Sequence, residues 1–282
     1  MFWLKGTGDP RSYSRSLIYS VFGYAKITGN QEWAAKLLPD MIKLYRKIED
    51  DNLTEYGLSW SYDGRDAMEK SISGSGLRPT LNSYMYANAY GLSKLAHWAN
   101  DLKTEHEYCK KADLIKNKLK KLLWDATDDF FKVIPQADKD SKIQDFSFAA
   151  MPTSQNVREA IGYIPWMFGI PDAKQDSAWQ YLMDKRYFKG QFGPTTAEKN
   201  HPEYFKSRGD HECLWNGPAW PFATTQILNG MIRLLKDGKT KVINKSAFME
   251  VIATYAKSHY RTGSNGKKVN WIDENIHPDT GE

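Results

Sequence analysis

The sequence contains few cysteines, no long apolar run and little net charge, and each shortage excludes a class of protein. Two cysteines, Cys109 and Cys213, occur in 282 residues, which fits neither a disulfide framework nor a zinc site and leaves the redox compartment open. No apolar run approaches the roughly 20 residues that span a bilayer. Residues 1–8 lack the apolar segment of a signal peptide. We therefore expect no membrane partner.

The charge also argues against nucleic acid as a partner. The formal net charge is +5, and the lysine-rich stretches 110–121 and 236–245 fall on predicted helix faces or in a turn. Lysines placed in this way are typical of a solvated surface rather than of a nucleic-acid site. The 41% apolar and 26% charged composition is typical of a folded globular domain.

Aromatic residues are the abundant feature, with 10 Trp and 16 Tyr, several of them in loops rich in Gly, Pro and Asn. A loop Trp or Tyr offers a flat apolar face with a polar edge, which suits stacking on a sugar ring or a base. The same rings can simply pack loops onto the body of the domain. Both interpretations stay open at this point.

Helical periodicity predicts an all-α fold. In the second segment, for example, Leu37, Met41, Leu44 and Ile48 form one apolar stripe. No segment alternates apolar and polar residues over a sustained length, so short strands are expected only in loops. The predicted helices span residues 12–28, 32–49, 81–100, 104–124, 155–169, 174–185, 220–236 and 246–260.

The connections between these helices alternate in length. Short links are expected at 29–31, 101–103, 170–173 and 237–245, and long loops at 50–80, 125–154, 186–219 and 261–282. Alternation of this kind places every long loop at the same end of antiparallel hairpins. A toroid of helical hairpins is favoured because no short solenoid repeat is visible. A closed ring of this type has six hairpins, so four imply an incomplete domain.

The first long loop carries three candidate carboxylates, Asp63, Asp66 and Glu69, beside small residues that let side chains point into a cleft. The alternative is a solvated acidic loop. The next helix begins with Arg78, Asn82 and Tyr84, which could donate to or stack on a hydroxyl-rich ligand, or could anchor the loop and cap the helix.

The third long loop ends with two indoles around a tight turn before a helix. These residues either line a sugar cleft or pack in the interior and hold the loop in place. They are Trp215, Asn216, Gly217 and Trp220. Glu212 precedes them and is a further candidate for substrate binding. It shares the loop with His201, His211 and Cys213, whose spacing matches no metal-ligand pattern. We expect no catalytic metal.

Four stretches, RPTLNSYMYANA, REAIGYIPWMFGIP, WNGPAWP and WIDENIHPDTGE, together resemble the six-hairpin (α/α)6 glycosidases. The closest resemblance is to glycoside hydrolase family 63 and the mannosylglycerate-hydrolase-like group, which are related to trehalases. In that group a glutamate before Pro-x-Thr-Gly is the general base, which corresponds to Glu274. The general acid is an aspartate in a Gly-aromatic-Asp-Asn-Ser-Pro stretch. Here AMEKSISG departs from it, with Glu69 as the best match and Asp66 and Asp63 as alternatives.

The resemblance implies that residues 1–282 are a glycosidase catalytic domain, partial at both ends, that hydrolyses an O-glycosidic bond of an oligosaccharide or glycoside with inversion. It implies a carbohydrate partner and no cofactor. The alternatives are a catalytically silent carbohydrate-binding toroid, or a lyase or epimerase that uses Tyr84, His97 or His211. An acidic substrate would instead require cations such as Arg11, Arg78 or Arg208 in the cleft.

Overall fold

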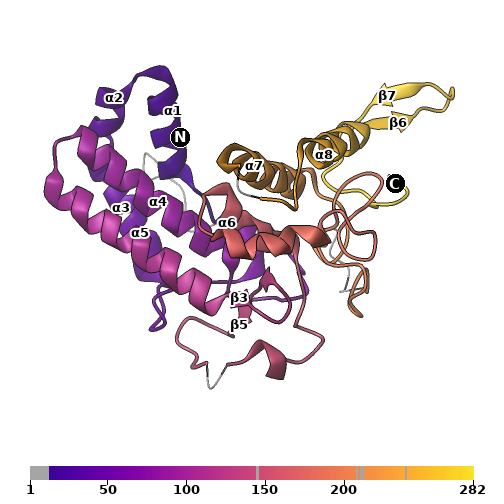
Figure 1. Cartoon of the computed structure of the whole chain (residues 1–282), viewed down its shortest axis with the longest axis horizontal. Coiled ribbons are helices and arrows are strands. Elements are labelled where there is room, and N and C mark those ends of the chain that lie inside the picture. Colours follow the sequence, from indigo (N-terminus) through magenta and orange to yellow (C-terminus); the bar gives the residue numbers. More distant parts are fainter. Residues whose placement is uncertain (1–12, 144–145, 208, 210–212, 239) are drawn as a thin grey trace. The chain divides into compact units, whose positions relative to one another are not determined.

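The computed structural model describes residues 13–143, 146–207, 209, 213–238 and 240–282, which form two compact units (Figure 1). The first unit contains the described residues of the ranges 1–67, 75–123 and 133–144. The second contains those of 68–74, 124–132 and 145–282. Each unit is therefore assembled from segments that are distant in the sequence.

The first unit is built on a long central helix and its antiparallel partner. Its helices are α1 (Leu17–Thr28), α2 (Gln31–Lys36), α3 (Leu38–Asn52), the 3₁₀ helix η1 (Asp63–Asp66), α4 (Pro79–Trp98) and α5 (Leu102–Leu122). Helix α4 packs against both α5 and α1. It begins at Pro79, whose missing N–H is no loss in a first turn, and α5 begins where Asp101 accepts a hydrogen bond from Thr104 N at 3.0 Å.

Two residues of α4 fix α1 against it. The Asn88 side chain accepts a hydrogen bond from Ile18 N at 3.1 Å and donates one to Arg15 O at 2.9 Å. At Gly91 an added Cβ would lie 3.1 Å from the Ile18 backbone, so the glycine permits the close approach. A helix that is buried nearly all round therefore forms the core of this unit.

The first unit also contains a small antiparallel sheet, with two strands before α4 and one after α5 in the sequence. Its strands, in the order β1-β2-β5, are β1 (Trp60–Ser61), β2 (Gly76–Leu77) and β5 (Ile134–Pro135). Gly76 has a φ of 157°, and a Cβ there would lie 2.1 Å from Ile134 O, so this register requires glycine. The sheet ties the end of the first long loop to the start of the second.

The second unit has a core of aromatic side chains. Phe130 stacks on Phe188 and meets Tyr163 edge-on, and Trp166 meets Trp179 edge-on. Gly162 permits this packing because a Cβ there would lie 2.2 Å from the Phe130 ring. The elements are β3 (Trp124–Asp125), β4 (Phe130–Phe131), η2 (Phe148–Ala150), η3 (Ala160–Tyr163), α6 (Ile164–Met167), η4 (Ala173–Tyr181), α7 (Pro221–Asp237), α8 (Lys245–Lys257), β6 (Tyr260–Thr262) and β7 (Lys268–Asn270).

Most of the predicted helices are present, but three predictions need correction. The segment 32–49 is two helices, because the chain turns at Leu37 before Pro39 opens the first turn of α3. The segments 155–169 and 174–185 form 3₁₀ helices and one short α-helix, broken by Pro165, Gly169 and Pro171. Strands span two or three residues each and lie in or at the borders of the predicted loops. No helix within the described ranges is long and apolar enough to cross a membrane.

Candidate active site

Asp66 and Arg78 form an ion pair in the interior of the first unit. Arg78 Nε donates to Asp66 Oδ2 at 2.6 Å, and neither side chain has any exposed surface. Each of these buried charges would destabilise the fold strongly if its partner were removed. Substrate therefore reaches neither group in this conformation, which weakens Asp66 as an alternative acid and Arg78 as a contact for an anionic sugar.

Arg78→Met is expected to destabilise the protein by about 3–5 kcal/mol, because it leaves the Asp66 charge buried without a partner. Chemical unfolding with urea measures this loss. The matched control is Arg233→Met, which breaks the half-exposed pair with Asp237 and should cost about 0–1 kcal/mol. Equal losses in the two variants would contradict the buried ion pair.

Asn82 anchors the loop rather than offering its amide to a ligand. Its Oδ1 accepts from Ser59 N at 2.7 Å, and its Nδ2 donates to Ser59 O and to Arg78 O, both at 2.9 Å. Tyr84 is buried, with 7% of its surface exposed. Asp63 is partly exposed and accepts from Gly64 N at 2.9 Å. Asp63 is the most accessible of these three residues, and substrate binding by all three stays a prediction.

Glu69 lies in a part of the first loop that belongs to the second unit. Its backbone carbonyl accepts a hydrogen bond from Trp215 N at 3.1 Å, and its side chain is half-buried. Within the described ranges the Glu69 carboxylate has no hydrogen bond or ion pair. A carboxyl group that is partly shielded from water and not engaged by the protein can serve as a proton donor to a substrate.

The residues after Glu69 are held by a buried carboxylate that the sequence analysis did not single out. Glu159, 4% exposed, accepts hydrogen bonds from Ile72 N at 2.8 Å, from Ser73 N at 3.3 Å and from the Ser73 hydroxyl. Ile72 packs with Val157 and Ala197 in a small apolar cluster. The sequence did contain a signal for this role, because Glu159 directly precedes the apolar run that begins at residue 160. A carboxylate next to buried residues is itself expected to be buried and to accept hydrogen bonds from the protein.

Glu159→Ala should lower kcat at least tenfold with little change in KM, because it frees the loop that carries Glu69. It should also reduce the unfolding free energy by about 1–3 kcal/mol for each N–H group left without an acceptor. Glu159→Gln keeps an acceptor oxygen and should retain most of the stability and activity. A folded Glu159→Ala protein with wild-type kcat would show that the loop does not depend on this residue.

The two indoles of the third loop are packed against each other. Trp215 and Trp220 stack with centroids 4.4 Å apart, and only 3% and 4% of their surfaces are exposed. Asn216 is fully buried, and its Nδ2 donates to Lys206 O at 2.8 Å. A Cβ at Gly217 would lie 2.4 Å from the Phe205 ring. The four residues thus form a rigid plug, and direct contact of any of them with sugar stays a prediction.

Glu274 is exposed and lies beside the same segment of the third loop. The Cys213 thiol donates to Glu274 Oε2 at 4.0 Å. Ala219 and Ile276 exchange two backbone hydrogen bonds, of 2.9 and 3.0 Å. Residues 213–220 therefore contact the loop of Glu69 through Trp215 and the loop of Glu274 through Cys213 and Ala219. The two predicted catalytic carboxylates lie on loops that one rigid segment connects.

The loop after Glu274 is also fixed. Lys199 Nζ pairs with both carboxylate oxygens of Asp279 at 2.7 Å, and Phe192 N donates to Pro278 O at 2.8 Å. Gly281 has a φ of 80°, and a Cβ there would lie 2.5 Å from the Phe192 ring. The Pro-x-Thr-Gly pattern thus has a physical role, because the glycine adopts a left-handed conformation against an aromatic ring.

Some candidates of the sequence analysis have no described position. Arg11, Arg208, His211 and Glu212 lie outside the described residues, so their roles stay predictions. His97 is on α4 in the first unit, where its Nδ1 lies 3.1 Å from Glu105 Oε2. No group of three or more His, Cys, Asp or Glu residues in the described ranges has the geometry to hold a metal ion.

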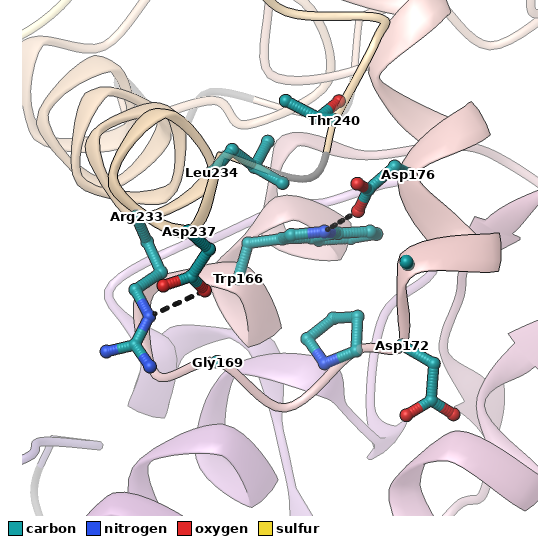
Figure 2. Close-up of a pocket in the computed structure, with 10 residues that line it drawn as sticks. Trp166, Gly169, Asp172, Asp176, Arg233, Leu234, Asp237 and Thr240 are labelled. Atoms are coloured by element: carbon teal, nitrogen blue, oxygen red, sulfur yellow. Dashed lines mark hydrogen bonds and ion pairs between the residues drawn. The ribbon is translucent and has the colours of Figure 1, made fainter.

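A pocket of about 270 Å³ lies at the other end of α7 (Figure 2). Trp166 Nε1 donates to Asp176 Oδ1 at 3.1 Å, and Arg233 pairs with Asp237. Burial raises the pKa of the Asp176 carboxyl. The α7 residues that line this pocket are Arg233, Leu234 and Asp237, which lie about 18–24 Å along the helix from its start at Pro221, the residue after Trp220. It is therefore not part of the site of Glu69 and Glu274.

Comparison with known proteins identifies the family. The sequence model of the mannosylglycerate hydrolase MGH1-like glycoside hydrolase domain matches residues 5–282. The chain belongs to this family. Membership makes it a glycosidase domain and confirms the predicted resemblance. The chain is also 33% identical, over 120 residues, to an uncharacterized protein of Borreliella burgdorferi, a match that covers 40% of the chain and 25% of that protein.

Solved structures show the same fold. A structure described as a sialidase is 32% identical, with a TM-score of 0.85 over 96% of the chain and 24% of its own length. The family 63 mannosylglycerate hydrolase of Thermus thermophilus, solved with glucose, has a TM-score of 0.72 at 12% identity and covers 97% of this glycoside hydrolase domain. The match includes 71% of the Thermus chain. The predicted fold class, an all-α (α/α)6 toroid of helical hairpins, is confirmed, since the chain is mostly helical and matches these toroid enzymes. The chain spans about a quarter of the sialidase and of the Borreliella protein.

Proposed function

We propose that this glycoside hydrolase domain cleaves an O-glycosidic bond with Glu69 as general acid and Glu274 as general base, with inversion at the anomeric carbon. The observation that carries the proposal is the contact of segment 213–220 with the loops of both glutamates. Hydrolysis requires one carboxyl group to protonate the leaving oxygen and a second to activate water. For inversion the two groups lie roughly 6.5–9.5 Å apart, which leaves room for that water.

The states of the two side chains support the assignment of roles. Glu69 is half-buried and has no ion-pair partner among the described residues, so its carboxyl group is left to contact the leaving oxygen of a substrate. Glu274 is exposed, so water can reach its carboxyl group. Asp66 is less suited to the acid role because Arg78 occupies one of its oxygens in the interior.

A carbohydrate is the proposed partner, and the named relatives suggest the first compounds to test. The full-length protein that contains this domain should be incubated with mannosylglycerate, nitrophenyl glycosides, manno- and gluco-oligosaccharides and sialosides. Release of a free sugar from at least one of them is expected. Sugar binding without any hydrolysis would favour the catalytically silent toroid. An unsaturated product would indicate a lyase.

A further inference from the structure

The β6–β7 hairpin continues from α8 in the second unit (Figure 1). An open groove is lined by residues from the end of that helix and from the hairpin and the segment that follows it. Its volume is about 690 Å³, within the roughly 300–1,000 Å³ that is typical of ligand sites. The residues that line it are Ala256, His259, Tyr260, Asn270, Trp271 and Ile272. No candidate of the sequence analysis is among them.

The indole of this groove is exposed and yet held in place. Trp271 is 46% exposed, and its backbone N–H donates to His259 O at 2.9 Å. Its Nε1 donates to Asp273 Oδ1 at 2.9 Å, and the Arg261 guanidinium, which pairs with Asp273, lies 5.0 Å from the ring centroid. Trp271 lines the groove, whereas Arg261 is not among its lining residues. An aromatic surface fixed before binding loses little entropy when it stacks on a ligand.

Hydrogen-bonding groups line the groove beside this indole. His259 Nδ1 donates to Tyr255 O at 2.7 Å, which leaves Nε2 as the ring nitrogen for a hydrogen bond with a ligand hydroxyl. The Asn270 amide offers a donor and an acceptor, and the Tyr260 hydroxyl does the same on a side chain that is 48% exposed. No lining residue has a fixed charge, which favours hydroxyl groups over carboxylates as ligand groups.

We propose that this groove is a sugar subsite in which a neutral pyranose ring of an oligosaccharide stacks on Trp271 beside the catalytic base. Trp271 and Glu274 are three residues apart, so their Cα atoms are separated by at most about 11 Å. One bound oligosaccharide can therefore extend from Glu274 onto the indole. The inference rests on the proposed function, because it extends the substrate cleft of that site.

Two substitutions separate stacking from a role in holding Glu274. Trp271→Ala removes the ring, whereas Trp271→Phe keeps an aromatic face and loses only the bond to Asp273. Binding of di- and trisaccharides is measured by titration in a Glu274→Gln background, so that no substrate is consumed. We expect Trp271→Ala to weaken trisaccharide binding about three- to tenfold and Trp271→Phe to weaken it less than twofold. The control is Trp33→Ala, an equally exposed indole in the first unit, which should change nothing.

Steady-state kinetics distinguish failure of this inference from failure of the proposed function. In the active enzyme, Trp271→Ala should raise KM for the longer substrates and leave nitrophenyl monosaccharides unaffected. Unchanged trisaccharide binding in Trp271→Ala, or equal losses on short and long substrates, would overturn the subsite while hydrolysis itself stands. An equal fall of kcat in Trp271→Ala and Trp271→Phe would assign Trp271 to positioning Asp273 and Glu274, and would also overturn it. Absence of hydrolysis in the unmutated full-length protein would instead reject the proposed function.

Discussion

Glu274→Gln should lower the rate of glycoside hydrolysis about a hundred- to ten-thousandfold, which is the usual contribution of general acid–base catalysis. Glutamine keeps the size of the side chain and its capacity for hydrogen bonds, but it cannot take a proton from the attacking water. Since Glu274 is exposed and its loop is held by backbone bonds at Ile276 and by the Lys199–Asp279 pair, the fold should not change. Sugar binding should therefore persist.

Glu282→Gln is the matched control, because it neutralises another exposed carboxylate of the same loop. Its kcat should equal that of the unmutated protein. Rates are measured by sugar release, and binding by titration with the uncleaved substrate. Full activity in Glu274→Gln would remove this residue from the mechanism. Loss of both rate and binding would assign it to substrate binding instead.

Glu69→Gln should produce a loss that depends on the leaving group. A general acid protonates the departing oxygen, so a sugar leaving group needs it, whereas an activated nitrophenolate departs with little protonation. We expect a loss of about a hundredfold or more on natural oligosaccharides and a much smaller loss on nitrophenyl glycosides. The measurement is kcat/KM for both substrate types at one pH.

Asp63→Asn and Asp66→Asn provide the comparison for Glu69→Gln. Asp63→Asn should not change the ratio between the two substrate types. Asp66→Asn should lower stability through the Arg78 pair and leave that ratio unchanged in the folded fraction. If Glu69→Gln instead loses equal activity on both substrate types, the acid role moves to whichever aspartate shows the leaving-group dependence.

The sequence predicted the long helices because their apolar stripes are strong and continuous. It could not predict the 3₁₀ helices at 160–163 and 173–181, whose backbone is set by tertiary packing of Phe130, Tyr163 and Trp179. The residues of these helices are as apolar as those of an α-helix, and periodicity does not distinguish the two types over a short segment. Prolines at 165 and 171 were the local signal that opposed a long helix.

The candidate site was predictable in part. The pattern around Glu274 indicated the base loop, but not the Lys199–Asp279 pair that fixes it, because those residues are 80 positions apart. The sequence could not decide whether Trp215 and Trp220 face a ligand or pack together, and they stack on each other in the interior. Asn82 likewise anchors Ser59, which only the fold brings within hydrogen-bond distance.

The central claim is that Glu69 protonates the leaving oxygen while Glu274 activates the attacking water. It predicts the anomeric configuration of the first product. Proton NMR of the anomeric hydrogen during the first minutes of hydrolysis distinguishes the two outcomes before mutarotation mixes them. Our account predicts that the released sugar has the anomeric configuration opposite to that of the substrate. Retention would contradict it, since retention requires one carboxylate to form a covalent glycosyl-enzyme intermediate.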